Sequence, residues 1–324
     1  MLSFLRYGAL AAVAATVPAV SMAADVWPSK PVRIVVSYPA GGVSDNVARA
    51  LSDKLSAQIG QSVLVENKAG AGGAIGLDQV AKSPADGYTI GFASISPVAL
   101  SPHLSKMAFD PQKDLQPVVS VMYSPVLILG TKINTAAGFT ELVQQAKKEP
   151  GSIRWATAGL ASLGHIVLEQ VRYTGKVDIT HVPYKGGGQQ LNDGLGGQYE
   201  VLSTNASPTL TPHIQSGSLK PLAVGAPKRL ESLPSVPTLA ELGYSAANMT
   251  SLFGIFAPAG TPQDVLNRLN AEINKALSHP DIQQRLKSSD NVPTGGSAEA
   301  FAKQIAAESA QNAKIIKAAR ISLQ

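Results

Sequence analysis

The chain reads VRIVVSYPAGG at residues 32–42 and VSDNVARALSDKLSAQI at residues 43–59. The first segment begins with a β-branched run, which is typical of a strand, and ends in a turn formed by Pro39 and a glycine pair. The second segment places an apolar residue at every fourth position from Val47 to Ile59, which is the spacing of an amphipathic helix. A strand, a glycine loop and a helix in this order predict an α/β fold.

The same order of elements recurs along the chain. Further strands are expected at residues 62–66, 88–93, 118–122, 126–129, 153–157, 179–182, 200–204 and 252–257. Further helices are expected at residues 77–81, 139–148, 162–173, 189–195, 208–216 and 265–277. This alternation indicates a largely parallel sheet, and two series of similar units fit the length of 324 residues.

The first residues have the features of an export signal. Arg6 precedes an apolar stretch at residues 9–17, and the small-residue pattern Ser21-Met22-Ala23 follows. The apolar stretch is about half of the ~20 residues that a membrane-spanning helix needs. We therefore expect residues 1–23 to be a signal peptide and the mature protein to function in the periplasm.

The composition excludes several classes of protein. A formal net charge of +5 with no dense block of lysine and arginine does not indicate a nucleic-acid surface. The absence of cysteine rules out disulfides, thiolate metal sites, thiol nucleophiles and a lipid-modified N-terminal cysteine.

Seven short segments together resemble a known family. They are WPSKPVRIV at 27–35, GGVSD at 41–45, VENKAGAGG at 65–73, ADGYT at 85–89, FDPQKDL at 109–115, HVPYKG at 181–186 and FAPAGTP at 256–262. In their order and number these segments are similar to the Bug-type substrate-binding proteins of tripartite tricarboxylate transporters. The similarity covers essentially the whole mature chain. Ala40 and the Ser203-Thr204-Asn205 segment depart from the family pattern, and both lie in loops expected to meet the ligand.

The resemblance implies a two-lobed periplasmic binding protein of the Venus flytrap type (type II-like), with two crossover strands. Lobe 1 would comprise residues 24–124 and 251–324, and lobe 2 would comprise residues 125–250. The ligand would be a small organic carboxylate (a di- or tricarboxylate, an acidic amino acid or an aromatic carboxylate), delivered to the membrane permease subunits of such a transporter. We expect a monomer with no enzymatic activity, no cofactor and no metal.

The expected site follows from the topology, because ligands of open α/β sheets lie outside the carboxyl ends of the strands. The loops at these ends are rich in glycine and hydroxyl groups, and they contain no arginine. We therefore predict that backbone N–H groups at helix starts and hydroxyl groups bind the anion. The predicted ligand-binding residues are Ala40, Gly41, Gly42, Ser44, Asp45, Ser94, Ser96, Thr157, Ala158, Gly159, Ser162, His165, Tyr184, Lys185, Gly186, Thr204 and Asn205.

Several of these residues have a second interpretation. Ser44 fits a ligand contact and a helix cap equally well, and Asp45 fits a structural role at the helix start better than a contact with a carboxylate. His165 fits a cap or a surface position somewhat better than a ligand contact. Tyr184 and Lys185 would supply an apolar wall and a charge, although a loop lysine is usually solvated. Asn205 would bind the ligand or form an Asx turn.

Other functions can be compared with the sequence. A dinucleotide site at Gly70 fails because the third glycine of G-x-G-x-x-G falls at Ile75. A hydrolase using Ser162 and His165 lacks the G-x-S-x-G elbow, and the five histidines lack zinc-ligand spacing. A ligand sensor acting on a signalling partner would have the same leader and fold, so this alternative stays open.

Overall fold

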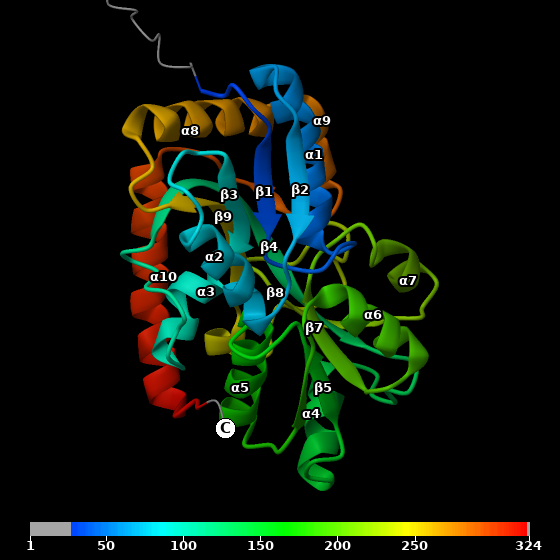
Figure 1. Cartoon of the computed structure of the whole chain (residues 1–324). Coiled ribbons are helices and arrows are strands. Elements are labelled where there is room, and N and C mark those ends of the chain that lie inside the picture. The colour runs from blue at the N-terminus through cyan, green and yellow to red at the C-terminus, as the bar shows by residue number, and fades with distance from the viewer. Residues whose placement is uncertain (1–26, 323–324) are drawn as a thin grey trace, which may run out of the picture.

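The computed structural model of the protein describes residues 27–322 (Figure 1). The predicted signal peptide at residues 1–23 lies outside this range. Across residues 27–322, no helix combines the length and the apolar character needed to cross a bilayer.

One continuous series of hydrogen-bonded strands crosses the molecule. The strands are β1 (Val32–Val36), β2 (Val63–Asn67), β3 (Thr89–Ser94), β4 (Leu115–Gly130), β5 (Arg154–Thr157), β6 (Thr180–Pro183), β7 (Val201–Asn205), β8 (Lys220–Gly225), β9 (Thr250–Pro258) and β10 (Val292–Pro293). Their order is β2-β1-β3-β9-β4-β7-β5-β6, and β8 and β10 also pair with β4. The β2-β1-β3 and β7-β5-β6 groups are parallel, as expected for strands that alternate with helices.

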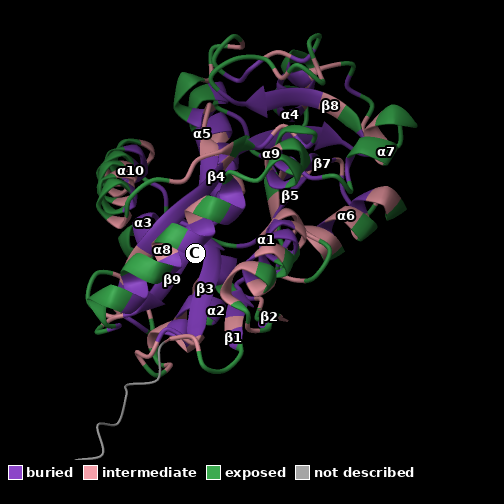
Figure 2. Cartoon of the chain, turned by 90° about the horizontal axis from the view of Figure 1, so that it is seen from above, coloured by how far each residue is buried: buried purple, intermediate pink, exposed green. Residues whose placement is uncertain are grey.

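Helices cover both faces of each half of this sheet. They are α1 (Val43–Ile59), α2 (Ala74–Ala81), α3 (Ser96–Ala99), α4 (Phe139–Lys148), α5 (Leu163–Gly175), α6 (Gly187–Gly196), α7 (Thr211–Gln215), α8 (Gln263–Leu277), α9 (Pro280–Lys287) and α10 (Ala298–Ala319). The strands are mostly buried, while the outer faces of the helices are exposed (Figure 2).

Side-chain alternation explains the two faces of the first half. Val32, Ile34 and Val36 of β1 pack into a core with α1 and α8, whereas Val35 points to the opposite core with α2 and α10. The second half has its own cores, one under α4 and α5 around Trp155 and one beneath α6. The molecule therefore has separate apolar cores in two halves.

Two long strands join the halves. The first part of β4 pairs with β9, and from Val126 onward β4 pairs with β7 and β8 instead. At this change of partners Pro125 of β4 lies opposite Thr250, where β9 begins. The lobe boundaries 24–124 with 251–324 and 125–250 remain a proposal, which this change of pairing supports. We use the terms first lobe and second lobe for these ranges.

The elements differ from expectation in several places, and helices α3, α9 and α10 and strand β10 were not among those predicted. The runs at 118–122 and 126–129 form the single strand β4, which continues through Pro125. Strand β8 was not predicted, because its opening Lys220-Pro221 resembles a turn more than a strand. It is an antiparallel neighbour of the second part of β4.

Candidate ligand-binding site

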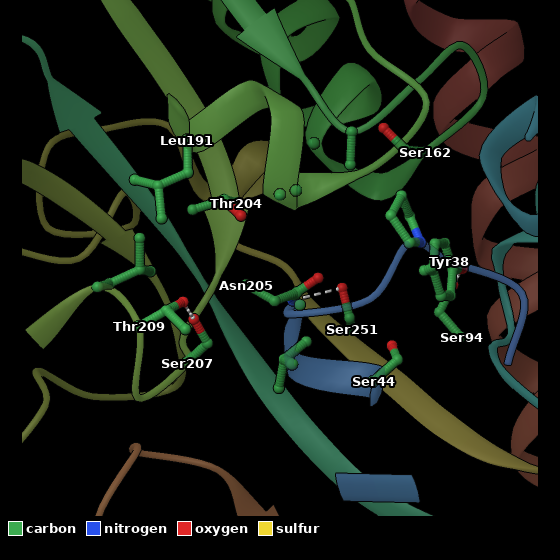
Figure 3. Close-up of a pocket in the computed structure, with 18 of the residues that line it drawn as sticks. Tyr38, Ser44, Ser94, Ser162, Leu191, Thr204, Asn205, Ser207, Thr209 and Ser251 are labelled. Carbon is green, nitrogen blue, oxygen red and sulfur yellow. Dashed lines mark hydrogen bonds between the residues drawn. The ribbon is translucent and has the colours of Figure 1, made fainter. Parts of the chain in front are cut away.

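A cavity of about 380 Å³ lies between the two lobes (Figure 3). Its lining includes the predicted residues Ala40, Gly41, Gly42, Ser44, Ser94, Ser96, Ala158, Ser162, Thr204 and Asn205. It also includes Tyr38, Pro39, Val43, Val126, Leu163, Gly164, Gly187, Gly188, Leu191, Asn192, Ser203, Ser207, Thr209, Leu210, His213, Ser251 and Phe253. Loops at the carboxyl ends of strands from both lobes therefore surround one space.

Three helices begin at this cavity. The first residues of α1, α5 and α6 (Val43, Leu163 and Gly187) all line it. The first N–H groups of a helix have no acceptor within the helix, and the N-terminus carries the positive end of the helix dipole. Among the residues that the structure describes, no lysine or arginine lines the cavity. Backbone amides are therefore the main positive groups that it offers to an anion.

The start of α1 is held by an acidic side chain. The Gly41 N–H donates to Asp45 Oδ2 over 3.0 Å, and Arg49 Nε donates to the same oxygen over 3.1 Å. Burial alone would raise the pKa of Asp45, but the bonds from Arg49 and Gly41 outweigh it and lower this pKa. Asp45 does not line the cavity, since its carboxylate is directed back into the loop. Gly42 is the N-cap, so Ser44 keeps its hydroxyl for the cavity.

The start of α5 is held by a serine cap. Ser162 Oγ donates to the Gly159 carbonyl over 2.7 Å and accepts the His165 N–H over 3.3 Å. The Ala161 N–H donates to His165 Nδ1 over 3.3 Å, with Ala161 at a left-handed φ of 54°. His165 is buried behind the loop and does not line the cavity.

Hydroxyl groups gather where β1 and β3 end. Tyr38 Oη lies 2.6 Å from Ser94 Oγ and donates to the Gly72 carbonyl over 3.3 Å. Burial raises the pKa of Tyr38 to about 12, although the bond with Ser94 lowers it in part. Tyr38 is therefore neutral at physiological pH, and its one proton is donated to the Gly72 carbonyl.

Asn205 lies beneath the middle of the cavity, at the crossing of the strands. Its amide nitrogen donates to Ser251 Oγ over 2.9 Å and to the Ser124 carbonyl over 3.3 Å. These bonds tie β7 to both strands that join the lobes. Figure 3 shows Asn205 and Ser251 between the two ends of the site.

The end of the cavity away from Tyr38 has a different character. Figure 3 places Leu191, Ser207 and Thr209 at this end. The hydroxyl oxygens of Ser207 and Thr209 lie 2.8 Å apart, and Leu210 and His213 also contribute to the lining. This end offers apolar carbon and neutral polar groups.

Five further predicted residues do not line the cavity. Thr157 is fully buried and bonds to His181, while Gly159 turns its carbonyl toward Ser162. Tyr184 Oη donates to Asp193 Oδ2 of α6 over 2.9 Å. Its ring therefore lies against α6 and does not line the cavity. Lys185 is exposed to solvent, and Gly186 packs against Pro39 of the other lobe.

Several lining residues were not predicted from the sequence. Tyr38 directly follows the strand end that was identified, and this position was the available signal. Ser251, Phe253 and His213 reach the cavity through long-range pairing and loop packing, for which no local pattern exists in the sequence.

The structure gives no support to the hydrolase alternative. The Ser162 hydroxyl donates to a carbonyl, and His165 Nδ1 already accepts a backbone N–H, so this serine has no base to activate it. Within residues 27–322, no group of three or more histidine and acidic side chains has a metal-binding arrangement.

Comparison with protein families gives one match over most of the chain. The family of receptors described as "Tripartite tricarboxylate transporter family receptor" matches residues 47–321. Protein BugT of Bordetella pertussis is 36% identical over 278 residues, covering 85% of each chain.

Solved structures give a consistent result. The periplasmic binding protein BugD superposes with a TM-score of 0.87 at 32% identity, covering 92% of this chain and 100% of BugD. Rpa4515 of R. palustris, solved with adipate, has a TM-score of 0.86 at 33% identity, covering 91% of this chain and 99% of that protein. MatC of Rhodopseudomonas palustris, solved with malate, has a TM-score of 0.85 at 27% identity, covering 90% and 100%. These similarities confirm the predicted two-lobed binding-protein fold.

Proposed function

The chain belongs to the tripartite tricarboxylate transporter family of receptors, and on that premise we propose that it binds a small organic carboxylate between its lobes. One observation carries this proposal most directly. The N-termini of α1, α5 and α6 converge on a single cavity that holds hydroxyl groups. Related proteins of the same fold were solved with adipate and with malate.

A carboxylate group would lie at the end of the cavity near Ser44, Ser94 and Ser162. The helix starts of both lobes meet there, and their amides and the Ser44 hydroxyl can donate to its oxygens. The rest of the ligand would extend toward Leu191 and Thr209, where apolar carbon and neutral donors line the space.

The available donors are sufficient for a useful affinity. A hydrogen bond to a charged group contributes about 1.5–3 kcal/mol net. A micromolar complex requires about 8 kcal/mol. Some four to six such bonds, less the cost of association, would reach this value.

Family membership supports a proposal for the partners and the compartment. Family membership supports delivery of the ligand to the membrane subunits of a tripartite tricarboxylate transporter, and the periplasmic relatives support export to the periplasm. We propose that the protein acts as a monomer and as a carrier instead of an enzyme. Neither Ser162 nor His165 is arranged for catalysis, which supports the carrier role.

Ligand-dependent melting tests the proposal. The mature protein is heated with adipate, malate, succinate, aspartate and benzoate in turn. A ligand present at about a hundred times its Kd stabilises the folded state by about 2.7 kcal/mol, so a true ligand should raise Tm by about 5 °C.

The same panel separates the alternatives. Response to one or a few carboxylates supports a dedicated receptor, and recovery of the unchanged compound after incubation supports a carrier. Turnover of the responding compound would revive the enzyme interpretation. No response to any carboxylate, in a protein that melts cooperatively, would contradict the proposal.

A further inference from the structure

The loops that precede α1 (residues 39–42) and α5 (residues 158–162) are here called the anion loops. A side chain from the following helix braces each loop, which means that it accepts a hydrogen bond from the loop backbone. In each, the third residue of the helix directs its side chain back to the N–H of the residue before the N-cap. In the first lobe Asp45 accepts the Gly41 N–H over 3.0 Å, and in the second lobe His165 accepts the Ala161 N–H over 3.3 Å. This geometry resembles a capping box, in which a side chain at this position satisfies a backbone donor near the start of the helix.

The two braces have opposite chemistry. Each bracing side chain has a partner of the opposite charge type four residues further along its helix. Arg49 donates to Asp45, whereas Glu169 Oε1 lies 3.6 Å from His165 Nε2. Since the Asp45 pKa is lowered, the first brace persists in mild acid. A histidine changes charge in the physiological range, so the second brace can be switched by pH.

A second histidine holds the first in place. The ring of His181 stacks on that of His165, with centroids 4.3 Å apart and planes inclined by 8°. His181 Nε2 lies 2.7 Å from Thr157 Oγ1, and Thr157 in turn bonds to Gly159 in the anion loop. His165 is only 4% exposed, so this stack forms the rear support of the loop.

We propose that His165, held by His181, is the positioning residue of the second-lobe anion loop, and that protonation of this imidazole pair weakens ligand binding. The inference rests on the proposed function for its consequence, but the positioning role belongs to the free protein as well.

The effect of the proton follows from the hydrogen bonds. His165 Nδ1 accepts the Ala161 N–H, so in the neutral ring the proton is on Nε2, facing Glu169. A second proton must go to Nδ1, which then becomes a donor and can no longer accept from Ala161. Ala161 has a left-handed φ of 54°, a strained conformation for alanine, and this bond helps to hold it.

Charged groups surround the stacked imidazole rings of His165 and His181. Glu169 faces His165 from the same helix, and Arg172 pairs with Glu169. Burial, His165 and Arg172 lower the pKa of His181 to about 4, against the influence of Glu169. Two stacked imidazolium rings would repel each other, so the pair takes up one proton more readily than two.

Two substitutions of His165 separate positioning from titration. The His165→Gln variant keeps an acceptor that can reach the Ala161 N–H but cannot titrate, and the His165→Ala variant removes the acceptor. Affinity for adipate is measured by calorimetry at about pH 7.5 and at about pH 5. The wild type should lose about tenfold in affinity over this range, corresponding to one hydrogen bond. The Gln variant should match the wild type at the higher pH and show less of this loss. The Ala variant should be about tenfold weaker at the higher pH.

Hydrogen exchange of the unliganded protein tests the brace even if adipate does not bind. Amides of the segment 158–165 should exchange faster in His165→Ala than in the wild type and in His165→Gln, after correction for intrinsic rates. Failure of adipate binding with this exchange pattern intact would count against the proposed function alone. Equal exchange in all three proteins would overturn the positioning role.

Two other histidines serve as controls. His103 is exposed and its ring bonds to Ser309 of α10, so His103→Asn should keep the wild-type pH profile. His213 lines the cavity itself. If His213→Asn removes the pH dependence while His165→Gln retains it in full, the switch is not in the stacked pair and the proposal is wrong. Because all variants bind the same adipate, protonation of the ligand cancels in the comparison.

Discussion

Ser44 is the side chain in α1 best placed to donate to the ligand. Its side chain is 2% exposed and points into the cavity from the second position of the helix (Figure 3). A hydroxyl that donates to a carboxylate contributes about 1.5–3 kcal/mol. We expect Ser44→Ala to weaken ligand binding by about tenfold or more, with little change in the Tm of the free protein. Titration calorimetry measures the first effect and thermal melting the second.

A surface serine provides the comparison. Ser278 is exposed at the end of α8 and bonds only to its own helix. The Ser278→Ala variant should bind as the wild type does. Equal affinity of the Ser44 and Ser278 variants would place the ligand away from α1.

The lowered pKa of His181 predicts that the folded protein loses stability in acid. Its pKa is lowered from 6.5 to about 4 in the folded protein, mainly because it is partly buried and beside His165 and Arg172. Between these values the unfolded chain binds more protons, so the free energy of unfolding should fall as pH drops from 6.5 to about 4. In His181→Phe, denaturant unfolding should show a shallower fall over this window. An unchanged slope in that variant would assign the effect to other groups.

At the scale of elements, glycine loops of the two lobes touch beside the cavity. A Cβ built on Gly72, in the loop before α2, would lie 2.8 Å from the Leu160 carbonyl oxygen of the second lobe. The Gly72→Ala variant should therefore hold the lobes apart and weaken ligand binding by about tenfold, through loss of contacts that need both lobes.

The matched control is Gly60→Ala. Gly60 has a φ of 68° against 62° at Gly72, but a Cβ at Gly60 would meet no atom within 4 Å. Both variants should lose about 1–2 kcal/mol of stability from the left-handed backbone. Only Gly72→Ala should lose affinity and give a larger radius of gyration with ligand in X-ray scattering. The same loss of affinity in both variants would show that strain, not the contact between lobes, is responsible.

Elements with a clear local period could be predicted from the sequence. Helix α1 and strand β5 appear within one residue of their expected bounds, because apolar spacing and strand-end glycines are local signals. Strand β4 was divided into two, since Pro125 suggests a break. In the structure this proline lies where β4 changes its pairing partners, a position that tolerates a missing N–H.

The site was predicted in outline only. Gly42 and Ser162 could be placed because each follows a strand and begins a helix. The contacts that turn His165 and Tyr184 away from the cavity could not be predicted. They are made with His181 and Asp193, which lie behind the loops. Ser251 and Phe253 were missed because the return of β9 to the first lobe places them at the cavity.

At the scale of the whole molecule, each lobe supplies one part of the binding surface. The start of α1 and the end of β3 come from the first lobe, and the starts of α5 and α6 come from the second. A ligand that contacts both parts binds the closed form more tightly than the open form, so it shifts the population toward closure. Asn205 ties the two joining strands together at the point about which such a motion would turn.

In the proposed function, negative oxygen is held between the lobes by helix-start amides and hydroxyls. The most direct test is a calorimetric titration of the mature protein with the strongest carboxylate of the panel and with the corresponding amide. We expect micromolar binding of the carboxylate and at least about a hundredfold weaker binding of the amide, since hydrogen bonds to a charged acceptor are roughly twice as strong. Equal affinity for the two compounds would contradict it.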